Sequence, residues 1–240
     1  NIALAAKTAE PHPKLPGTIH TAAEEVRAAG GEALPILCDI RDGAQVGEAV
    51  AQAAEAFGGL DVVVNNASAI SLTGTGDTPL RRYDLMTGVN SRGTFAVTQA
   101  ALPHLLVSER AHVLTLAPPP DLAPKWFRGH PAYSLAKYGM SLLTLGWAAE
   151  FEGRIAVNAL WPRTTIDTAA VRNLLGGAAM ASASRSPAIM GDAAVAILSR
   201  PVTFSGWFCL DDLVLAAEGV ADFDRYAVSP GTPLQPDFFV

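Results

Sequence analysis

The sequence lacks the features that mark membrane-spanning and nucleic-acid-binding proteins. Half of its 240 residues are hydrophobic, yet no uncharged apolar run reaches the length of about 18 residues that a membrane span needs. The formal net charge is -6, and Lys and Arg form no cluster. Nucleic acids and anionic membranes bind concentrated basic faces, so neither is expected as a partner. We therefore expect a soluble protein that acts on a small molecule.

Cysteine is scarce, and motifs for metal binding or export are missing. Cys38 and Cys209 lie in apolar segments without CxxC or Cys/His spacing, so we expect reduced structural thiols. His104, His112 and His130 lack metal-ligand spacing and are typical of surface or loop histidines, so no metal site is expected. The absence of secretory and lipidation motifs predicts a cytoplasmic location. Abundant alanine and the excess of Arg over Lys favour a bacterial source.

Apolar runs and helical patterns alternate along the chain. This order predicts an α/β fold with a parallel, doubly wound, Rossmann-like sheet in one domain over residues 1–218. Residues 219–240 lose the periodicity and are expected to form a C-terminal arm, whose apolar ending we expect to pack on a neighbouring subunit. The expected strands cover residues 2–6, 33–38, 60–64, 112–116, 155–160 and 207–210, and the expected helices cover residues 18–30, 44–57, 80–106, 131–151 and 188–198.

Tyr133 and Lys137 form the first pattern that indicates chemistry. They lie four residues apart at the start of an expected helix, which places both side chains on one face, one turn apart. A lysine ammonium beside a tyrosine favours the phenolate and lowers the tyrosine pKa from about 10. The pair is therefore suited to pass a proton to or from a substrate oxygen, although the same spacing also arises by chance on exposed helix faces.

Polar residues follow several of the expected strands. Lys7, Asp39 and the pair Asn65–Asn66 come directly after the first three strands. Ligands of doubly wound sheets bind beyond the carboxyl ends of the strands, so Asp39 and Asn66 are candidates to contact the adenine and ribose of a nucleotide. Each is also typical of a turn former or helix cap.

An ordered set of residues resembles the short-chain dehydrogenase/reductase family, and the likeness runs from Asn1 to at least Leu210. The set is Asp39, Asn65-Asn66-Ala67-Ser68, Asn90, Tyr133, Lys137, and Val157-Asn158-Ala159 before Pro162. More narrowly, residues 5–8, 11–15, 65–71, 132–141, 155–164 and 234–237 are similar to the hydroxysteroid dehydrogenase-like protein 2 group. The resemblance implies an oxidoreductase that transfers hydride between a nicotinamide and a carbonyl or alcohol. It also implies a homodimer or homotetramer.

The resemblance implies roles for individual residues. Tyr133 would be the general acid/base, Lys137 would hold the nicotinamide ribose, and Asn90 would anchor a water that links Lys137 to solvent. Lys7 favours NADP(H) over NAD(H), because a cation suits a 2′-phosphate, although Lys7 is also typical of a solvated surface lysine. The implied cofactor contacts are Lys7, Asp39, Ile40, Asn66, Ala67, Tyr133, Lys137 and Thr165.

Three features depart from the family pattern. The family's first strand and glycine-rich turn are absent from this sequence, and that strand would be central in the sheet, so we expect the natural polypeptide to extend upstream by roughly 30 to 40 residues, the size of one βα unit. Ala117-Pro118 stands where the family has a catalytic serine, and loss of an oxyanion-type donor commonly costs about 10²- to 10³-fold in turnover. Arg163 is expected either to recognise an anionic substrate or cofactor phosphate, or to pair with Asp167.

Bulky apolar residues in the loops near the expected site favour an apolar substrate such as a lipid or a steroid-like alcohol, although they are equally suited to fill the local core. These residues are Trp126, Phe127, Trp161, Leu174 and Leu175.

Two functional hypotheses remain open. The first is an NADP(H)-dependent oxidoreductase, favoured by Asn90, Tyr133 and Lys137 because a protein that only binds needs no proton relay. The second is a nucleotide- or lipid-binding protein of the same fold with little or no turnover, favoured by the missing serine at Ala117.

Overall fold

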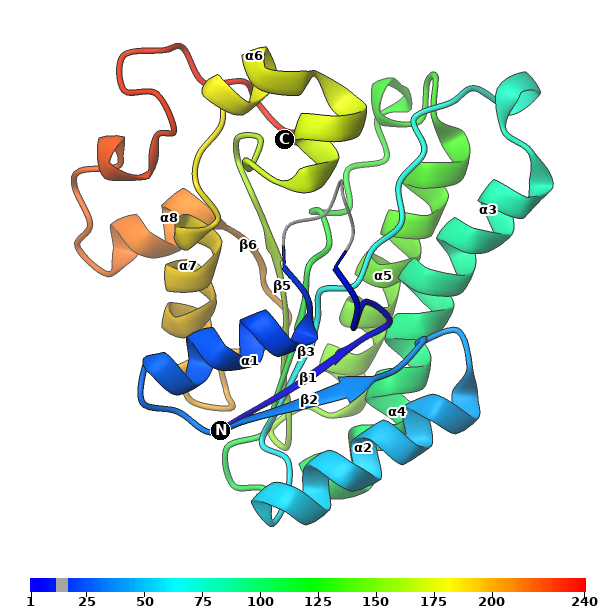
Figure 1. Ribbon diagram of the computed structural model, residues 1–240, viewed down its shortest axis with the longest axis vertical. Helices are drawn as coiled ribbons and strands as arrows, with labels where there is room; N and C mark the ends of the chain where they lie inside the picture. Colours follow the sequence, from blue (N-terminus) through cyan, green and yellow to red (C-terminus); the bar gives the residue numbers. More distant parts are fainter. Residues whose placement is uncertain (12–16) are drawn as a thin grey trace.

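The computed structural model describes residues 1–11 and 17–240. The chain folds into two parallel sheets flanked by helices (Figure 1). Part of the stretch over residues 11–15 that carries the resemblance lies outside the described residues.

All pairings within the two sheets are parallel. In the first sheet β1 pairs with β2, and in the second the order is β3-β4-β5-β6. The carboxyl ends of the strands of one sheet therefore lie at a common edge, as the alternating pattern predicted. The bounds are β1 (Ile2–Ala6), β2 (Ala33–Leu37), β3 (Val62–Asn65), β4 (His112–Thr115), β5 (Ala156–Trp161) and β6 (Phe208–Leu210).

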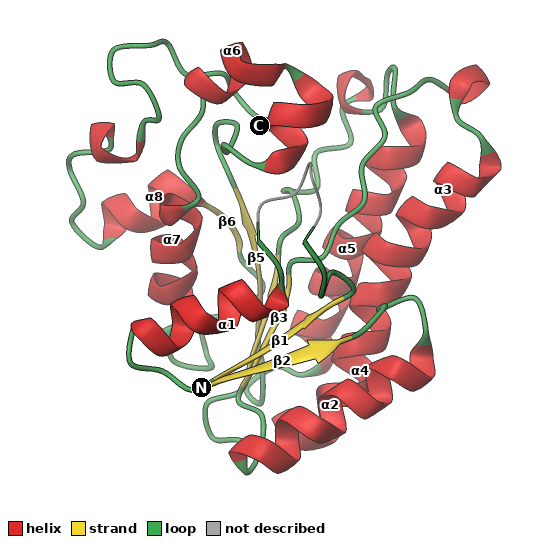
Figure 2. Cartoon of the chain, in the orientation of Figure 1, coloured by secondary structure: helices red, strands yellow, loops and turns green. Residues whose placement is uncertain are grey.

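Helices flank the sheets on both sides, which confirms the doubly wound α/β class. Figure 2 shows α1, α7 and α8 on one side and α2, α4 and α5 on the other. The bounds are α1 (Ile19–Ala28), α2 (Gly43–Phe57), α3 (Leu80–Thr87), α4 (Thr94–Leu105), α5 (Pro131–Glu150), α6 (Gly177–Ser182), α7 (Ala188–Leu198) and α8 (Asp211–Ala217). Short helical turns are η1 (Thr75–Asp77), η2 (Gly88–Gly93), η3 (Pro124–Trp126), η4 (Val171–Leu175) and η5 (Asp224–Tyr226). None of the helices in the described part of the chain is both long and apolar enough to cross a membrane.

The helix expected over residues 80–106 is divided by the π-helical segment η2. Gly93 closes this segment where the chain passes very near Ile40, since a Cβ at Gly93 would lie 2.5 Å from Cδ1 of Ile40. A larger residue at Gly93 would push these segments apart. Asn90 lies within the same segment and is fully buried. π-helical turns often occur at functional sites, because they change the direction in which side chains point.

A groove separates the two sheets. Among the described residues no strand lies between β1 and β3, and the groove between them has a volume of about 310 Å³. Val62 and Val64 of β3 remain 36% and 48% exposed, although central strands of parallel sheets normally bury such residues. The prediction that the central strand and its turn are missing from this sequence is thereby confirmed.

The carboxyl-terminal residues pack on their own chain. Backbone hydrogen bonds join Thr165 N to Gln235 O at 2.9 Å and Asp237 N to Arg163 O at 3.0 Å. Phe239 is 2% exposed and lies among aromatic side chains of the α5 region. These residues therefore pack on the loop after β5 of their own chain, which supplies both hydrogen-bond partners and an apolar surface. The expected contact of this apolar ending with a neighbouring subunit stays a prediction.

Candidate active site

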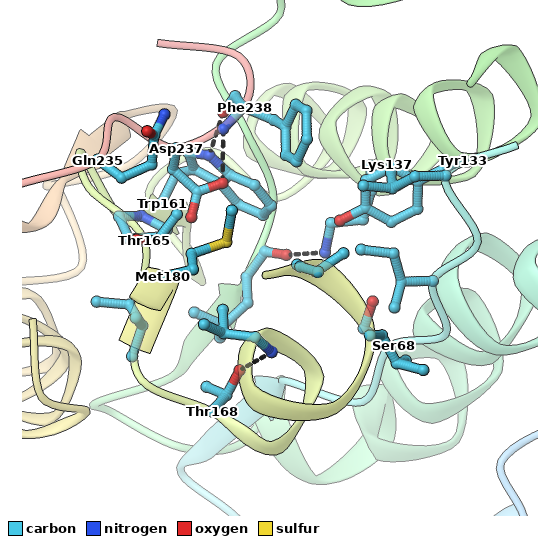
Figure 3. A pocket seen from close by; sticks show the side chains of 18 of the residues that line it. Ser68, Tyr133, Lys137, Trp161, Thr165, Thr168, Met180, Gln235, Asp237 and Phe238 are labelled. Carbon is cyan, nitrogen blue, oxygen red and sulfur yellow. Dashed lines mark hydrogen bonds between the residues drawn. The ribbon is translucent and has the colours of Figure 1, made fainter. Parts of the chain in front are cut away.

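A cavity of about 1110 Å³ lies beyond the carboxyl ends of β3, β4 and β5. Figure 3 shows Tyr133 and Lys137 on one side of it and residues of the C-terminal arm on another. Most of its lining is apolar, so it is suited to a ligand with an apolar body. Residues that line it include Asn66, Ser68, Ile70, Leu72, Leu116, Trp126, Tyr133, Lys137, Trp161, Thr165, Leu174, Leu175, Met180 and Asp237.

Tyr133 is placed by the first turn of α5. Pro131 begins the helix, where its missing N–H leaves no hydrogen bond unmade. The Tyr133 side chain is buried at 5% exposure and lines the cavity. Its pKa lies above the ordinary value, because burial penalises the phenolate and the Asp237 carboxylate repels it. The lowering expected from the sequence does not occur.

Lys137 explains why the tyrosine pKa is not lowered. Its ammonium donates a hydrogen bond to the Leu116 carbonyl at 2.6 Å, just beyond β4, and lies 4.9 Å from the centre of the Trp161 ring. Burial lowers the lysine pKa to about 7, and the attraction of Asp237 opposes this effect only in part. A lysine that is charged only part of the time near neutral pH stabilises a neighbouring phenolate weakly.

Asn90 fixes the loop that follows β3. Its Oδ1 accepts a hydrogen bond from Ala69 N at 2.7 Å, and its Nδ2 donates to Ala69 O at 3.1 Å. This bidentate contact holds the segment over residues 66–69 at the edge of the cavity. The bonds give Asn90 a positioning role, and the expected link through water to Lys137 stays a prediction.

The position expected for a catalytic serine carries no hydroxyl in the cavity. Ala117 is completely buried and packs against Met140 and Ala159. Ser68 instead lines the cavity, and Figure 3 places it on the side where Tyr133 and Lys137 lie. A hydroxyl there is an alternative donor for a substrate oxygen.

The expected cofactor residues fall into two groups. Asn66, Tyr133, Lys137 and Thr165 line the cavity, whereas the others lie outside it. Thr165 shares a hydrogen bond of 2.7 Å with Ser184 through their hydroxyls. Asn66 is exposed and faces both the cavity and the groove, so it lies where the two spaces meet.

Of the remaining expected cofactor residues, Lys7, Asp39 and Ile40 lie near the ends of β1 and β2, and Ala67 follows β3. Asp39 accepts a hydrogen bond from Arg41 Nε at 2.9 Å, and this ion pair lowers the pKa of Asp39 to about 2. Lys7 is exposed and also acts electrostatically on Asp39. Ile40 and Ala67 line the groove between the sheets. The partner Arg41 was not expected from the sequence.

The structure corrects the expected pairing of Arg163 with Asp167. The Nε atom of Arg163 donates to Asp212 at 2.6 Å, and Arg163 is not among the residues that line the cavity, so its expected role in recognising an anionic group stays a prediction. Asp167 is bound by Arg172 at 2.6 Å. The beginning of α8 brings Asp212 to Arg163 from a distant part of the sequence, and no local pattern predicts this contact.

The apolar loop residues are divided between the cavity and the core. Trp126, Trp161 and the Leu174–Leu175 pair line the cavity, as expected for a site that takes an apolar ligand. Phe127 stacks on Tyr138 with ring centres 5.1 Å apart and fills the local core.

The histidines and cysteines form no metal site in residues 1–11 and 17–240. His112, expected at the surface or in a loop, is buried on β4 at 3% exposure, and burial lowers its pKa. His130 Nδ1 lies 3.0 Å from Ser134 Oγ at the start of α5. Cys38 and Cys209 are both free and buried, in agreement with their expected structural role.

Asp237 is the cavity residue that the sequence interpretation missed. It lies in the C-terminal arm, more than a hundred positions from Tyr133, yet its charge affects the pKa of both Tyr133 and Lys137. Two signals were available: residues 234–237 carry part of the family resemblance, and Asp237 is a charged residue followed by three apolar residues at the end of an otherwise irregular segment.

Comparison with known proteins agrees with this geometry. A family model described as enoyl-(acyl carrier protein) reductase matches residues 15–197. The hydroxysteroid dehydrogenase-like protein 2 of Danio rerio is 56% identical over 240 residues, which cover 100% of this chain and 58% of the relative. The chain thus spans a little over half the length of this curated relative.

Two solved structures are also similar. A candidate dehydrogenase from Xanthomonas campestris has a TM-score of 0.95 at 55% identity, with 99% of this chain and 88% of that chain covered. A short chain dehydrogenase from Mycobacterium thermoresistibile has a TM-score of 0.93 at 52% identity, with 99% and 85% covered. This chain belongs to the short-chain dehydrogenase/reductase family.

Proposed function

We propose that the protein is an NADP(H)-dependent oxidoreductase that acts on the carbonyl or alcohol of a small apolar or lipid-like molecule. The observation that carries this proposal is the buried Tyr133–Lys137 pair on the wall of a largely apolar cavity of about 1110 Å³. Apolar walls bind an apolar body, while Tyr133 contacts the reacting oxygen and Lys137 contacts the cofactor.

The residues at the substrate end fit a nicotinamide and its ribose. An ammonium group has three donors, and Lys137 uses one of them on the Leu116 carbonyl, which leaves donors for ribose hydroxyls. Asn66 and Thr165 line the same cavity. The nicotinamide supplies or accepts the hydride when it is bound.

Tyr133 would move the proton in this reaction. Its raised pKa keeps the phenol protonated at neutral pH, and a protonated phenol is the form that donates a proton to a carbonyl oxygen. This electrostatic environment supports reduction of a carbonyl more than oxidation of an alcohol. Lys137 would hold the ribose, and Asn90 would hold the loop over residues 66–69 against it.

The experiment is a binding and turnover comparison on the natural full-length polypeptide. NADPH and NADH binding is measured by fluorescence titration, and NADPH oxidation is then followed with a panel of apolar ketones for wild type and Tyr133→Phe. Turnover that disappears in the variant while NADPH binding persists supports the proposal. Nucleotide binding with no turnover by the wild type contradicts it.

The second candidate is a binding protein of the same fold with little or no turnover. Ala117 favours it, because this buried methyl group replaces the hydroxyl that the family uses beside the tyrosine. It predicts that a lipid-like ligand binds the cavity and that Tyr133→Phe changes no reaction rate.

A further inference from the structure

The C-terminal arm places one carboxylate in the wall of the cavity. Asp237 lines it together with Gln235, Pro236 and Phe238 (Figure 3). One carboxylate oxygen, Oδ1, accepts a hydrogen bond of 2.6 Å from the backbone N–H of Phe238. The other oxygen makes no hydrogen bond within the described residues, and it remains available to a ligand.

The arm holds this carboxylate in a defined position. Asp237 N donates to Arg163 O at 3.0 Å, and Trp161 Nε1 donates to Phe238 O at 2.7 Å. Phe239 is buried behind it against the rings of Tyr133 and Trp161. These contacts fix the backbone of Asp237 and the two residues that follow it, so its side chain enters the cavity from a rigid support.

The second carboxylate oxygen of Asp237 is a strong hydrogen-bond acceptor that has no donor among the described residues. The wall around it is formed largely by apolar side chains such as Met180, Leu174 and Leu175. The charged and titratable groups that act on Asp237 or respond to it are Lys137, Tyr133 and Asp211. Burial raises the pKa of Asp237 to about 6, which shows how little compensation the protein supplies. Asp237 is half-buried, so water reaches the second oxygen, and a ligand donor would take the place of that water.

We propose that Asp237 is a specificity-determining residue that selects apolar carbonyl substrates carrying a second group that donates a hydrogen bond, namely a hydroxyl. The free oxygen of Asp237 accepts that hydrogen bond while the reacting carbonyl lies at Tyr133. The same carboxylate repels substrates with an anionic group at that position. This inference rests on the proposed function, because it concerns the substrate of the same cavity.

The expected size of the preference for hydroxyl substrates depends on how far Asp237 is buried. Sites built to bond a substrate hydroxyl can reject the analogue without it by about 10⁴-fold or more. Asp237 is only partly buried by its own chain, so water can replace the substrate hydroxyl in part. We expect a preference of about 10- to 100-fold.

The test uses three kinds of probe with the full-length polypeptide and NADPH. They are 2-decanone, its derivatives with one hydroxyl at carbons 4 to 10, and the matching methoxy derivatives. A hydroxyl donates a hydrogen bond, whereas a methoxy group only accepts one. The wild type is expected to reduce the best hydroxyl derivative with a kcat/KM about 10- to 100-fold above that of its methoxy counterpart.

Asp237→Asn is the decisive variant. Its amide oxygen can still accept from Phe238 N–H, and its NH₂ group then donates into the cavity in place of an acceptor. The preference for hydroxyl over methoxy is expected to fall at least tenfold, mainly through KM. Both probes are reduced by the same enzyme, so this ratio is independent of any change in turnover that loss of the Asp237 charge causes at Tyr133 and Lys137. Glu218→Gln is the matched control, because Glu218 is an exposed carboxylate paired with Arg200 outside the cavity.

Two outcomes separate this inference from the proposed function. If wild type reduces 2-decanone but treats hydroxyl and methoxy derivatives alike, the role of Asp237 is overturned and the oxidoreductase proposal stands. If no ketone is reduced, the proposed function fails, and direct binding of the same probes by calorimetry decides the role of Asp237. Equal binding of hydroxyl and methoxy derivatives by wild type and Asp237→Asn would then refute it.

Discussion

The substrate end and the adenine end of the proposed site are built very differently. The substrate end, formed by Tyr133, Lys137, Trp161 and Asp237, lines the cavity of about 1110 Å³, and its polar groups are desolvated. The adenine end, formed around Lys7, Asp39 and Ile40, borders the groove between the two sheets, and Asp39 is neutralised by Arg41.

The two ends differ in the physical cause that shifts the pKa values of their ionisable groups. Burial moves the pKa of Lys137 to about 7, whereas a partly exposed ion pair moves that of Asp39 to about 2. Large changes are therefore expected from substitutions at the substrate end and small ones at the adenine end.

Tyr133→Phe should cause the largest effect. Removal of the phenol takes away the proton donor, and general acid catalysis typically contributes about 10²- to 10⁴-fold. We expect ketone reduction to fall by about 10³-fold while NADPH affinity changes less than about threefold, as measured by NADPH oxidation and fluorescence titration.

Tyr138→Phe is the control, because Tyr138 donates to the Asp121 carbonyl outside the cavity. It should keep its activity. Equal loss of activity in both variants would mean that the phenol of Tyr133 has no special role.

Lys137→Met should change the dependence of stability on pH. The folded-state pKa of about 7 lies below the ordinary value of 10.5, so the unfolded chain binds more protons between these values. The contribution of Lys137 to stability is present above pH 10.5 and is lost as the pH falls through 7.

Urea unfolding at pH 6 to 10 measures this effect. The wild type should gain stability across the interval by up to about 4 kcal/mol more than the variant. Parallel pH profiles for the two proteins would show that Lys137 is not desolvated.

Phe239→Ala should destabilise the substrate end. Phe239 is 2% exposed and contacts the rings of Tyr133, Trp126 and Trp161, so its truncation leaves a cavity. Truncation of a buried Phe typically costs about 3 to 5 kcal/mol.

We expect a loss near 3 kcal/mol in chemical unfolding, together with a higher KM for apolar ketones. Phe127→Leu, a milder change in the adjoining core, should lower stability less and leave KM unchanged. A stable Phe239→Ala protein with normal KM would show that the arm does not pack there in solution.

Among these variants Lys7→Ala should have the smallest effect. That effect should be on the preference for NADPH over NADH. Lys7 is exposed, and a solvated cation contributes modestly to binding of a 2′-phosphate. We expect NADPH affinity to fall about tenfold and NADH affinity to stay constant in fluorescence titrations. An equal change for both cofactors, or none, would assign Lys7 to the solvated surface.

Much of the fold could be predicted because the underlying patterns are local. The helix over 188–198 was predicted with the bounds that α7 has, and the helix over 131–151 differs from α5 by one residue. The helix over 80–106 was predicted in extent, but its π-helical segment was not, and neither was the close approach of the distant Ile40 side chain to Gly93.

The placement of Tyr133 and Lys137 on one helix face was predicted from the sequence, whereas the electrostatics of the pair were not. Tyr133 and Lys137 lie together on the cavity wall because residues four positions apart lie on the same face of an α-helix. The direction of the tyrosine pKa shift was wrong, since it depends on burial and on Asp237, and neither can be derived from helical spacing.

The sequence by itself determined the alternating strands and helices, the shared face of Tyr133 and Lys137, and the missing central strand. These features follow from the pattern of neighbouring residues and from the order of the elements along the chain. Only the tertiary structure decided which carboxylate enters the cavity, which partner Arg163 takes, and how far burial moves the pKa of Lys137. The physical reason is that charge interactions and desolvation depend on distance in space, and the arm that carries Asp237 reaches α5 only after the chain has folded.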